Sequence, residues 1–374
     1  MRLPGTTRRR ATAEADVAVV GSGLPSRLTA LELSRRGASV VVVGDAPESP
    51  SARGLGLVLL GPGRPYLSVA KSIGRPAAQL VWAAGCENHL RAKAFVDQAA
   101  RDCGYVARGS FLLARNRSQA HELAESEDML RDDGFSGEFL DHYMLETRFD
   151  LSGFPGAYWA AEDAELDAEQ VLAAVGQAAR AAGVVFRPGR ARALREEASG
   201  VVVELEKGSL RASAGVVATD GSAAALVPEV APLLRPAGSA RITLSALAGA
   251  TLPGVARTAD GRIAWQANGS TVLLAETGPR SLPEPDEDLL TEFASRLPVQ
   301  VGSVRHIQEA GEVSVDGLPL VGRLPGRPLA VACGFGCLAP GFAFAAARWV
   351  ADALLRGTDP TPEALRATRA ASDV

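Results

Sequence analysis

Apolar runs alternate with segments of helical periodicity at the start of the chain. Residues 16–21, DVAVVG, form an apolar run typical of a strand that helices cover on both faces. Gly21 and Gly23 follow, and leucines at helical spacing then lead to Gly37, a typical residue just past a helix end. A second apolar run, 38–44, completes a βαβ unit, for which a right-handed crossover is expected.

Later segments repeat this alternation of elements. An amphipathic helix is predicted within residues 164–182, with a strand directly after it. Residues 200–221 predict two alternating strands joined by a turn at Lys207 and Gly208, followed by a third, apolar strand. Residues 329–347 carry no charge over the length of a membrane span, but their glycines and proline favour a buried strand, a turn and a helix start.

The middle of the chain has a different pattern. Segments 240–252, 261–270 and 270–277 alternate and form hairpins, which predicts a mostly antiparallel sheet. Residues 82–104 predict a helix that covers it. With 374 residues the chain is long enough for two domains.

Composition excludes several classes of protein. The net charge of −4 gives no reason to expect a nucleic-acid partner or an anionic membrane. Four cysteines are too few for a disulfide scaffold, and the four histidines show no metal spacing. We therefore expect a cytoplasmic protein without a metal. Residues 1–13 are expected to form a flexible N-terminal tail.

The first glycine turn predicts a dinucleotide site. Its first glycine permits the tight bend, its second lets backbone approach a pyrophosphate, and the helix N-terminus offers free N–H groups. Ser26 stands at the third glycine position and Pro25 removes one N–H donor. Gly44 stands where a carboxylate would bind the ribose hydroxyls, so Asp45 either takes that role or the site binds its ligand weakly.

Five segments follow one another along nearly the whole chain: DVAVVGSGLPSRLTALELSRRGASVVVV, ELDAEQVLAAVGQAARAAGVVF, ASAGVVATDGSAA, DGLPLVG and GFGCLAPGFAFAAARWVADALL. In these segments and in their order, the chain resembles the D-amino acid oxidase-like (DAO) family of FAD-dependent oxidoreductases. It implies an α/β fold with a discontinuous Rossmann-like FAD-binding domain (14–80, 151–234 and 301–374). It also implies an α+β substrate domain on a mostly antiparallel sheet (81–150 and 235–300).

FAD is the cofactor that this resemblance implies, held non-covalently because residues 309–315, where some relatives attach it, contain no cysteine. Cys333 and Cys337 are interpreted as small packing residues. A helix N-terminus beside the flavin stabilises the charge that develops on reduction. The expected cofactor-binding residues are Gly21, Gly23, Leu24, Ser26, Asp45, Gly221, Asp316, Gly322, Gly334, Phe335, Gly336 and Gly341.

The family resemblance also implies a reaction. A small amine or amino acid would be oxidised at its C–N bond by hydride transfer to flavin N5, followed by imine hydrolysis and reoxidation by oxygen. Where relatives hold a substrate-binding arginine, this chain has Glu312. Either another arginine, such as Arg262 or Arg241, grips a substrate carboxylate, or the substrate carries a cationic or neutral group. Glu312 itself either faces an amine or is a solvated loop residue. Trp265 is expected to wall the pocket, with a plain core position as the alternative, and His306 is a weaker candidate for a base.

Two other functions stay open at this stage. The altered glycine turns fit a flavoprotein-fold subunit or pseudoenzyme with weak or lost FAD binding. A flavin dehydrogenase that passes electrons to a partner is the second alternative. A homodimer or a partner subunit fits either possibility, and the sequence does not name the substrate.

Overall fold

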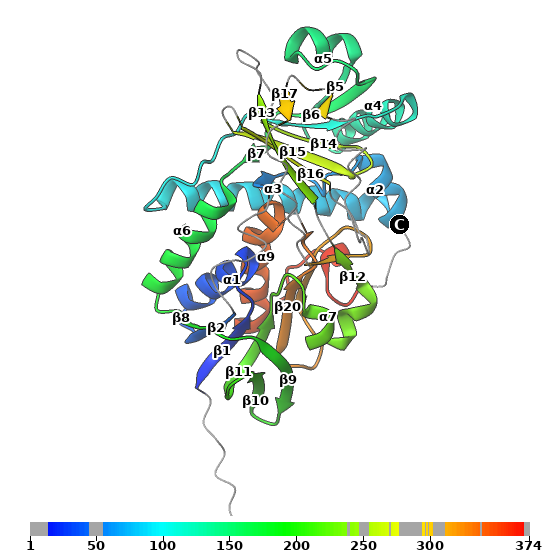
Figure 1. The fold of residues 1–374 in the computed structure, drawn as a ribbon. Coiled ribbons are helices and arrows are strands. Elements are labelled where there is room, and N and C mark those ends of the chain that lie inside the picture. The colour runs from blue at the N-terminus through cyan, green and yellow to red at the C-terminus, as the bar shows by residue number, and fades with distance from the viewer. Residues whose placement is uncertain are drawn as a thin grey trace, which may run out of the picture.

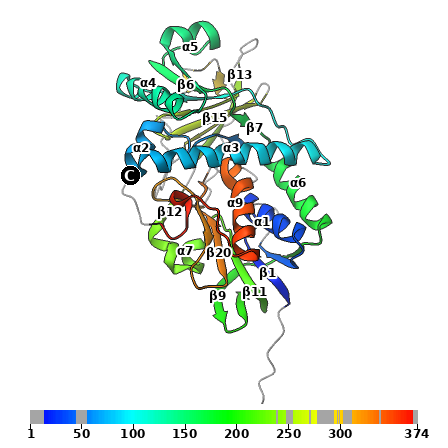
Figure 2. The ribbon, with the colours of Figure 1, turned by 180° about the vertical axis from the view of Figure 1, so that it is seen from behind.

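Two eight-stranded sheets carry the fold of the computed structural model. The structure describes residues 14–44, 55–237, 240–246, 254–268, 271–276, 294–295, 297, 299–301, 311–336 and 339–369. The long helix α3 (Arg75–Gln98) crosses between the two sheets in both views (Figures 1 and 2).

The first sheet contains the parallel strands that the N-terminal βαβ unit predicts. Its order is β19-β20-β11-β1-β2-β8, in which β20, β11, β1, β2 and β8 run parallel and β19 is antiparallel to β20. Strands β10 and β9 form an antiparallel extension of β11. Strand β1 pairs in parallel with β2 on one side and β11 on the other. The strands are β1 (Ala15–Val20), β2 (Val40–Val43), β8 (Val185–Arg187), β9 (Ala191–Glu197), β10 (Gly200–Leu205), β11 (Ser209–Val217), β19 (Leu320–Arg323) and β20 (Leu329–Cys333).

Both faces of this sheet are buried. Val17 and Val19 of β1 face a core shared with three helices, whereas Ala18 and Val20 join a second core on the other side. Successive strand residues point to opposite faces, so the continuous apolar run of β1 satisfies both cores. The three helices are α1 (Leu24–Arg35), α6 (Ala168–Ala181) and α9 (Ala339–Leu355), and the opposite core is covered by α7 (Ala223–Leu226) and the 3₁₀ helix η2 (Pro228–Leu233).

The second sheet is mostly antiparallel, as the sequence predicts. Its order is β17-β13-β16-β15-β14-β4-β6-β5, and among the described pairs β4 with β14 is parallel and the rest are antiparallel. The strands are β4 (Ser110–Leu113), β5 (Glu138–Asp141), β6 (Gly156–Ala160), β13 (Ala240–Ala246), β14 (Val255–Thr258), β15 (Ile263–Asn268), β16 (Thr271–Glu276) and β17 (Val299–Val301). Helices α2 (Tyr66–Ile73), α4 (Arg117–Asp132) and α5 (His142–Phe149) complete this half.

The second sheet has an inner face turned toward the first domain and an outer face with its own core. Val255, Ala264 and Ala275 on the inner face belong to the same core as helices α1 and α9. Ala256 and Trp265 lie on the outer face, in a separate apolar cluster. Two short pairs lie outside the two large sheets: β3 (Leu57–Val58) with β7 (Ala164–Glu165), and β12 (Leu234–Ala237) with β18 (Gly311–Ser314).

Two segments differ from their sequence-based interpretation. The apolar strand expected at the end of 200–221 is the second half of β11, because this strand continues from the β10 hairpin into parallel pairing with β1. Strand β6, inside the segment 151–234 that was assigned to FAD binding, pairs with β4 and β5 in the second sheet. The domain boundaries as a whole stay a prediction.

The uncharged segment near the C-terminus is a strand, a turn and a helix start, as predicted. Strand β20 ends at Cys333 and helix α9 begins at Ala339, and most of this segment is buried in the first domain. Within the described part of the chain, no helix combines the length and the hydropathy that crossing a bilayer requires.

Candidate functional site

The N-terminal glycine turn has the geometry of a phosphate site. Gly21 has φ of 139°, and a Cβ there would overlap the carbonyl oxygen of Ala218 at the end of β11. Gly23 is the N-cap of α1, which begins at Leu24 without a side-chain cap and without an acidic residue in its first turn. The first-turn N–H groups and the positive end of the helix dipole therefore suit an anionic group.

Ser26 and Pro25 are accommodated without disrupting this turn. Ser26 is fully buried, and its hydroxyl donates a 2.8 Å hydrogen bond to the Gly23 carbonyl oxygen. The Thr29 hydroxyl donates in the same way to the Pro25 carbonyl oxygen, at 2.7 Å. A small residue at position 26 is thus compatible with close packing of helix and strand, and the turn fits the pyrophosphate of FAD.

Gly44 shows why the ribose-binding carboxylate is missing. A Cβ at this position would lie 2.8 Å from both the carbonyl carbon and the carbonyl oxygen of Gly21, which is closer than real Cβ contacts. The end of β2 therefore lies too near the glycine turn to hold any side chain. Asp45 lies outside the described residues, so its role at the ribose stays a prediction.

The aspartate loop is held by the C-terminal segment. The Asp316 carboxylate accepts hydrogen bonds from Nε and Nη2 of Arg369 at 2.7 and 2.8 Å, and from the Leu318 N–H at 3.0 Å. Both side chains of this ion pair are buried. Gly322 has φ of 113°, and a Cβ there would lie 2.8 Å from a carboxylate oxygen of Asp359. In this structure Asp316 and Gly322 thus contact the chain's own C-terminal segment, and their contact with a cofactor stays a prediction.

The second glycine turn precedes helix α9. Gly334 and Gly336 both have positive φ, at 72° and 52°, and Phe335 between them is buried and bridged to Val313. Gly341 lies inside the first turn of α9, where a Cβ would be 3.6 Å from the Leu59 carbonyl oxygen. The glycines therefore bring the start of α9 close to the segment after β3.

The side-chain amide of Asn88 fixes the start of α9 against α3. Fully buried, Asn88 donates from Nδ2 to the Pro340 carbonyl oxygen at 2.8 Å. Its Oδ1 accepts from the N–H groups of Phe344 and Ala345 at 3.0 and 3.2 Å. One amide thus bonds to three backbone groups in the first turns of α9, which orients the start of this helix.

The environment of Cys333, near this turn, is that of a core packing residue. Cys333 is fully buried, and burial raises the pKa of its thiol far above the ordinary value. A thiol that stays protonated is a poor nucleophile. Cys337 lies outside the described residues.

Glu312 caps a helix. Its carboxylate accepts hydrogen bonds from the N–H of Ala223 at 2.8 Å and of Ala224 at 3.4 Å, at the start of α7, which follows the exposed Gly221. Its own N–H donates to the Asp220 carbonyl oxygen at 2.7 Å. These bonds engage Glu312 within the protein, and a contact with a substrate amine stays a prediction.

Of the remaining candidates, the structure describes Trp265 and Arg262. Trp265 is fully buried in the outer-face core, which is the plain core position left open by the sequence. Arg262 lies in the turn between β14 and β15, where its N–H donates to Asp260 at 3.1 Å. The side chain of Arg241 on β13, like the whole of His306, lies outside what the structure describes.

An arginine that the sequence-based candidates did not include projects from the inner face. Arg257 follows Val255 by two residues on β14, so both side chains point toward the first domain, and Arg257 is 7% exposed. It lines a cavity of about 50 Å³ between the sheet and the segment 59–64. The cavity is lined by Leu59, Leu60, Gly61, Gly63, Arg64, Trp82, Ser110, Phe111, Leu112, Tyr158, Ala160, Asp163, Val255 and Arg257.

Glycines bring the segment 59–64 close to this cavity. A Cβ at Gly61 would lie 2.5 Å from the Trp82 ring, and one at Gly63 would lie 2.7 Å from a guanidinium nitrogen of Arg257. The half-buried Arg64 donates to the Asp316 carbonyl oxygen at 3.4 Å, which connects the cavity to the aspartate loop. Burial lowers the pKa of Arg64, and the charge of Arg257 lowers it further.

Asp163 is the buried carboxylate of this cavity. Its Oδ2 accepts from the Ser110 hydroxyl at 2.5 Å and its Oδ1 from the Leu60 N–H at 2.8 Å. His89 Nε2 lies 3.9 Å from Oδ1. Burial raises the pKa of Asp163 to about 7, despite the two hydrogen bonds, which favour the ionised form.

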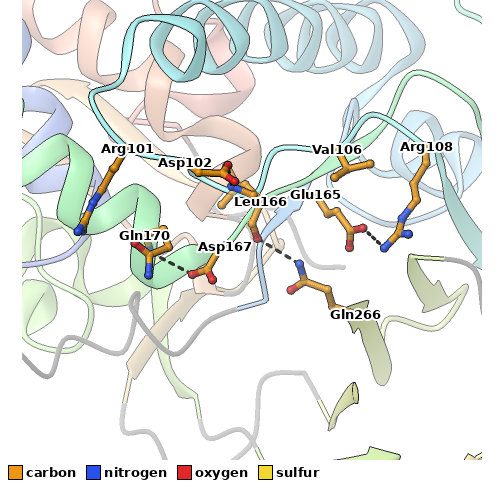
Figure 3. Close-up of a pocket in the computed structure, with 10 residues that line it drawn as sticks. Arg101, Asp102, Val106, Arg108, Glu165, Leu166, Asp167, Gln170 and Gln266 are labelled. Atoms are coloured by element: carbon orange, nitrogen blue, oxygen red, sulfur yellow. Dashed lines mark hydrogen bonds and ion pairs between the residues drawn. The ribbon is translucent and has the colours of Figure 1, made fainter. Parts of the chain in front are cut away.

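A second, wider hollow of about 550 Å³ lies around Arg108, Glu165 and Gln266 (Figure 3). Gln266, the cross-strand neighbour of Val255, accepts from the Gly56 N–H at 3.0 Å and donates to the Leu166 carbonyl oxygen at 3.1 Å. Arg108 forms an ion pair with Glu165, whose pKa is raised by burial. The hollow is lined by Arg101, Asp102, Gly104, Val106, Arg108, Glu165, Leu166, Asp167, Gln170 and Gln266. Among the described residues, no group of three or more histidine, cysteine, aspartate or glutamate side chains has the arrangement of a metal site.

Solved structures with related folds act on amino acids. Glycine oxidase from Geobacillus kaustophilus is 22% identical, with a TM-score of 0.76 over 92% of this chain and 95% of that one. L-amino acid deaminase from Proteus vulgaris is 19% identical (TM-score 0.76; 97% and 96% covered), and L-proline dehydrogenase from P. horikoshii is 15% identical (TM-score 0.77; 96% and 98% covered). At these identities the likeness establishes the fold. No curated protein sequence matches the chain at a significant level.

The family follows from a match that covers most of the sequence. The family model described as FAD dependent oxidoreductase, DAO, matches residues 16–353, from the start of β1 to the last turns of α9. This range contains both glycine turns, the aspartate loop and both sheets. The chain therefore belongs to the DAO family of FAD-dependent oxidoreductases.

Proposed function

We propose that this protein oxidises the C–N bond of a small amino acid or amine, with FAD bound non-covalently. The observation that carries the proposal is Arg257 on the inner face of the second sheet, which lines a cavity together with Leu59, a neighbour of Gly341 at the start of α9. Its guanidinium is suited to a substrate carboxylate, which it can hold through two parallel hydrogen bonds.

FAD, when bound, supplies a flavin ring that takes up the hydride from the carbon next to the amine nitrogen. The turn at Gly21 and Gly23, with the start of α1, would hold its pyrophosphate. The start of α9, fixed by Asn88, would place its positive end near the ring. Val255 and Ala264 give the inner face an apolar surface that excludes water from the reacting atoms.

The substrate-facing part of the site is small. Its 50 Å³ is about the volume of one or two water molecules, which suits the small polar end of an amino acid and not a bulky group. Arg257 and Arg64 both line this cavity, so an anionic group there meets two cations. The arrangement supports an amino acid over an uncharged amine.

The test combines cofactor and product. Protein purified and reconstituted with FAD should be yellow, and a panel of amino acids and amines should yield peroxide with at least one amino acid. A preparation that FAD leaves colourless contradicts the assignment of the cofactor. A yellow preparation that no amine or amino acid reduces contradicts the assignment of the reaction.

Weak FAD binding is a second candidate, favoured by the close approach of Gly44 to Gly21. Without a carboxylate at the ribose, the adenosine half would be held mainly through the pyrophosphate. A protein that binds FAD with a dissociation constant far above cellular concentrations, and shows no turnover, would support a subunit or pseudoenzyme.

The electron acceptor is proposed to be oxygen. If flavin is reduced by substrate without peroxide formation, the protein is a dehydrogenase that passes electrons to a partner. A homodimer or a partner subunit stays a prediction, which the mass of the purified particle in solution tests.

A further inference from the structure

Asp163 is a buried carboxylate that the proposed function has not yet used. It lies between β6 and β7, is 4% exposed, and lines the same cavity as Arg257. Ser110 and the Leu60 N–H each bond one of its oxygens, and each carboxylate oxygen has a further lone pair.

The cavity thus pairs two kinds of group. Arg257 and Arg64 present positive charge, suited to the carboxylate of an amino acid, and Asp163 lines the same cavity with a group that can accept a proton. An amino acid enters as a zwitterion, with a protonated ammonium group. Oxidation at the C–N bond requires the neutral amine, because the nitrogen must have its electron pair available to form the imine.

We propose that Asp163 is a catalytic residue that accepts the ammonium proton of the substrate, an inference that rests on the proposed amino acid oxidation. One N–H bond of the ammonium breaks and one O–H bond forms on an Asp163 carboxylate oxygen. The amine nitrogen keeps the electron pair, and no electrons leave the substrate in this step.

The electrostatics of the cavity favour this transfer. Burial, together with the charge of Glu162, places the pKa of Asp163 near neutral pH, where a base is most effective. Burial lowers the pKa of His89 on α3, whose Nε2 lies 3.9 Å from Oδ1, and so favours the neutral imidazole. On the other side, Arg257 and Arg64 lower the pKa of a nearby ammonium group, because like charges disfavour the protonated form.

A purely structural role is the competing explanation, because Asp163 also ties Leu60 to Ser110. Ser110→Ala separates the two roles. It keeps the carboxylate but removes a hydrogen bond that lowers the pKa of Asp163. If Asp163 accepts the proton, the pH dependence of flavin reduction in this variant shifts toward higher pH.

The first experiment is anaerobic flavin reduction by an amino acid substrate across pH 5 to 10, in FAD-reconstituted protein. In the wild type, the rate should rise with pH and level off above about pH 7. Asp163→Asn should be about 100-fold slower at pH 7 and recover toward high pH, where the substrate arrives already deprotonated. Glu169→Gln, at an exposed position on α6 outside the cavity, should match the wild type.

A second readout does not depend on turnover. An amino acid that lacks an α-hydrogen, 2-aminoisobutyrate, binds without being oxidised. Its binding at pH 8 should produce the infrared carbonyl band of a protonated carboxyl group in the wild type and in Glu169→Gln, but not in Asp163→Asn. A band that persists in Asp163→Asn, or that is missing in the wild type, overturns the proposal.

These outcomes are distinct from failure of the proposed function itself. If no amino acid reduces the flavin at any pH, the proposed reaction is wrong. If the wild type, Ser110→Ala and Asp163→Asn share one pH profile, with Asp163→Asn folded by thermal unfolding, the reaction stands and the role of Asp163 is wrong.

Discussion

The structure explains why residue 44, where a ribose-binding carboxylate was expected, is a glycine. From the sequence it is a lost carboxylate, and in the structure it is a position where no side chain fits beside Gly21. Restoring an acidic residue there should therefore not restore ribose binding.

We expect Gly44→Glu to lower the free energy of unfolding by about 1–3 kcal/mol, the usual cost of forcing extra atoms into a packed site. FAD affinity should fall or stay unchanged. Flavin fluorescence titration of wild type and variant measures it. Tighter FAD binding by Gly44→Glu would mean that the end of β2 lies farther from the glycine turn than described.

Arg257 and Arg262 belong to the same hairpin, so Arg262 is a matched control for substitutions of Arg257. Arg257 lines the cavity, whereas Arg262 lies in the connecting turn. Arg257→Met should lower kcat/KM for an amino acid by about 100-fold, which corresponds to losing about 3 kcal/mol of charge-assisted hydrogen bonding.

Arg262→Met should leave kcat/KM within a few-fold of the wild type. Steady-state kinetics with one amino acid and its decarboxylated amine provide the measurement. The loss in Arg257→Met should vanish for the amine, which has no carboxylate. The reverse ranking of the two variants would favour Arg262, the expectation from the sequence.

At the scale of elements, the C-terminal segment holds the aspartate loop. Besides its ion pair with Asp316, Arg369 donates to the carbonyl oxygens of Pro319 and Leu318, and Ala367 bonds to Val321 of β19. The 3₁₀ helix η4 (Glu363–Leu365) lies in the same segment. The loop is thus positioned by residues about 50 positions later in the chain.

Removing this contact should be costly. Arg369→Ala leaves the buried Asp316 carboxylate without its cation, and we expect a loss of about 3–5 kcal/mol in the free energy of unfolding. Arg356→Ala removes an exposed partner of Asp352 and should cost less than about 1 kcal/mol. Urea unfolding of both variants measures the two free energies. Equal losses of unfolding free energy would contradict the claim that the C-terminal segment holds the aspartate loop.

Some elements were predictable from local pattern and others were not. The amphipathic spacing of α6 and the apolar run of β1 identify these elements, because each buries a face that its own residues define. The sequence-based boundaries put strand β6 among the FAD-binding segments, although it pairs with β4 and β5 of the second sheet. The composition of a strand does not tell which other strands it pairs with.

The part of the site formed by glycine turns was predictable from the sequence, because a particular backbone geometry requires glycine. The side chains that line the cavity were less predictable. The turn at Gly21 and Gly23 follows from sequence because only glycine fits there. The spacing of two residues on one strand predicts that Arg257 and Val255 share a face of the sheet, but the sequence does not say which face turns inward. Asp163 was missed because it follows β6, a strand assigned to the other domain.

At the scale of the whole molecule, the cavity at the junction of the two halves should influence stability as well as chemistry. The pKa of Asp163 is about 7 in the folded protein against an ordinary value of 3.8, so folding binds its proton more tightly. This contribution is fully present below about pH 4 and is lost as the pH rises through 7.

The free energy of unfolding should therefore fall between pH 4 and pH 7, and Asp163→Asn should flatten this dependence. Asp133, held by Arg75 and Tyr66, has its pKa lowered to about 2, so its contribution is lost only as the pH falls toward 2. Urea unfolding at pH 5, 6, 7 and 8 tests the window. An equal slope in wild type and Asp163→Asn would mean that Asp163 titrates normally.

The central claim is that an amino acid delivers reducing equivalents to FAD held between the glycine turns and the second sheet. Anaerobic mixing of the FAD-reconstituted protein with a panel of small amino acids and their decarboxylated amines tests it most directly. We expect the visible flavin absorption to bleach with at least one amino acid, and to bleach more slowly with the matching amine. A flavin that binds and stays oxidised with every compound would contradict the account.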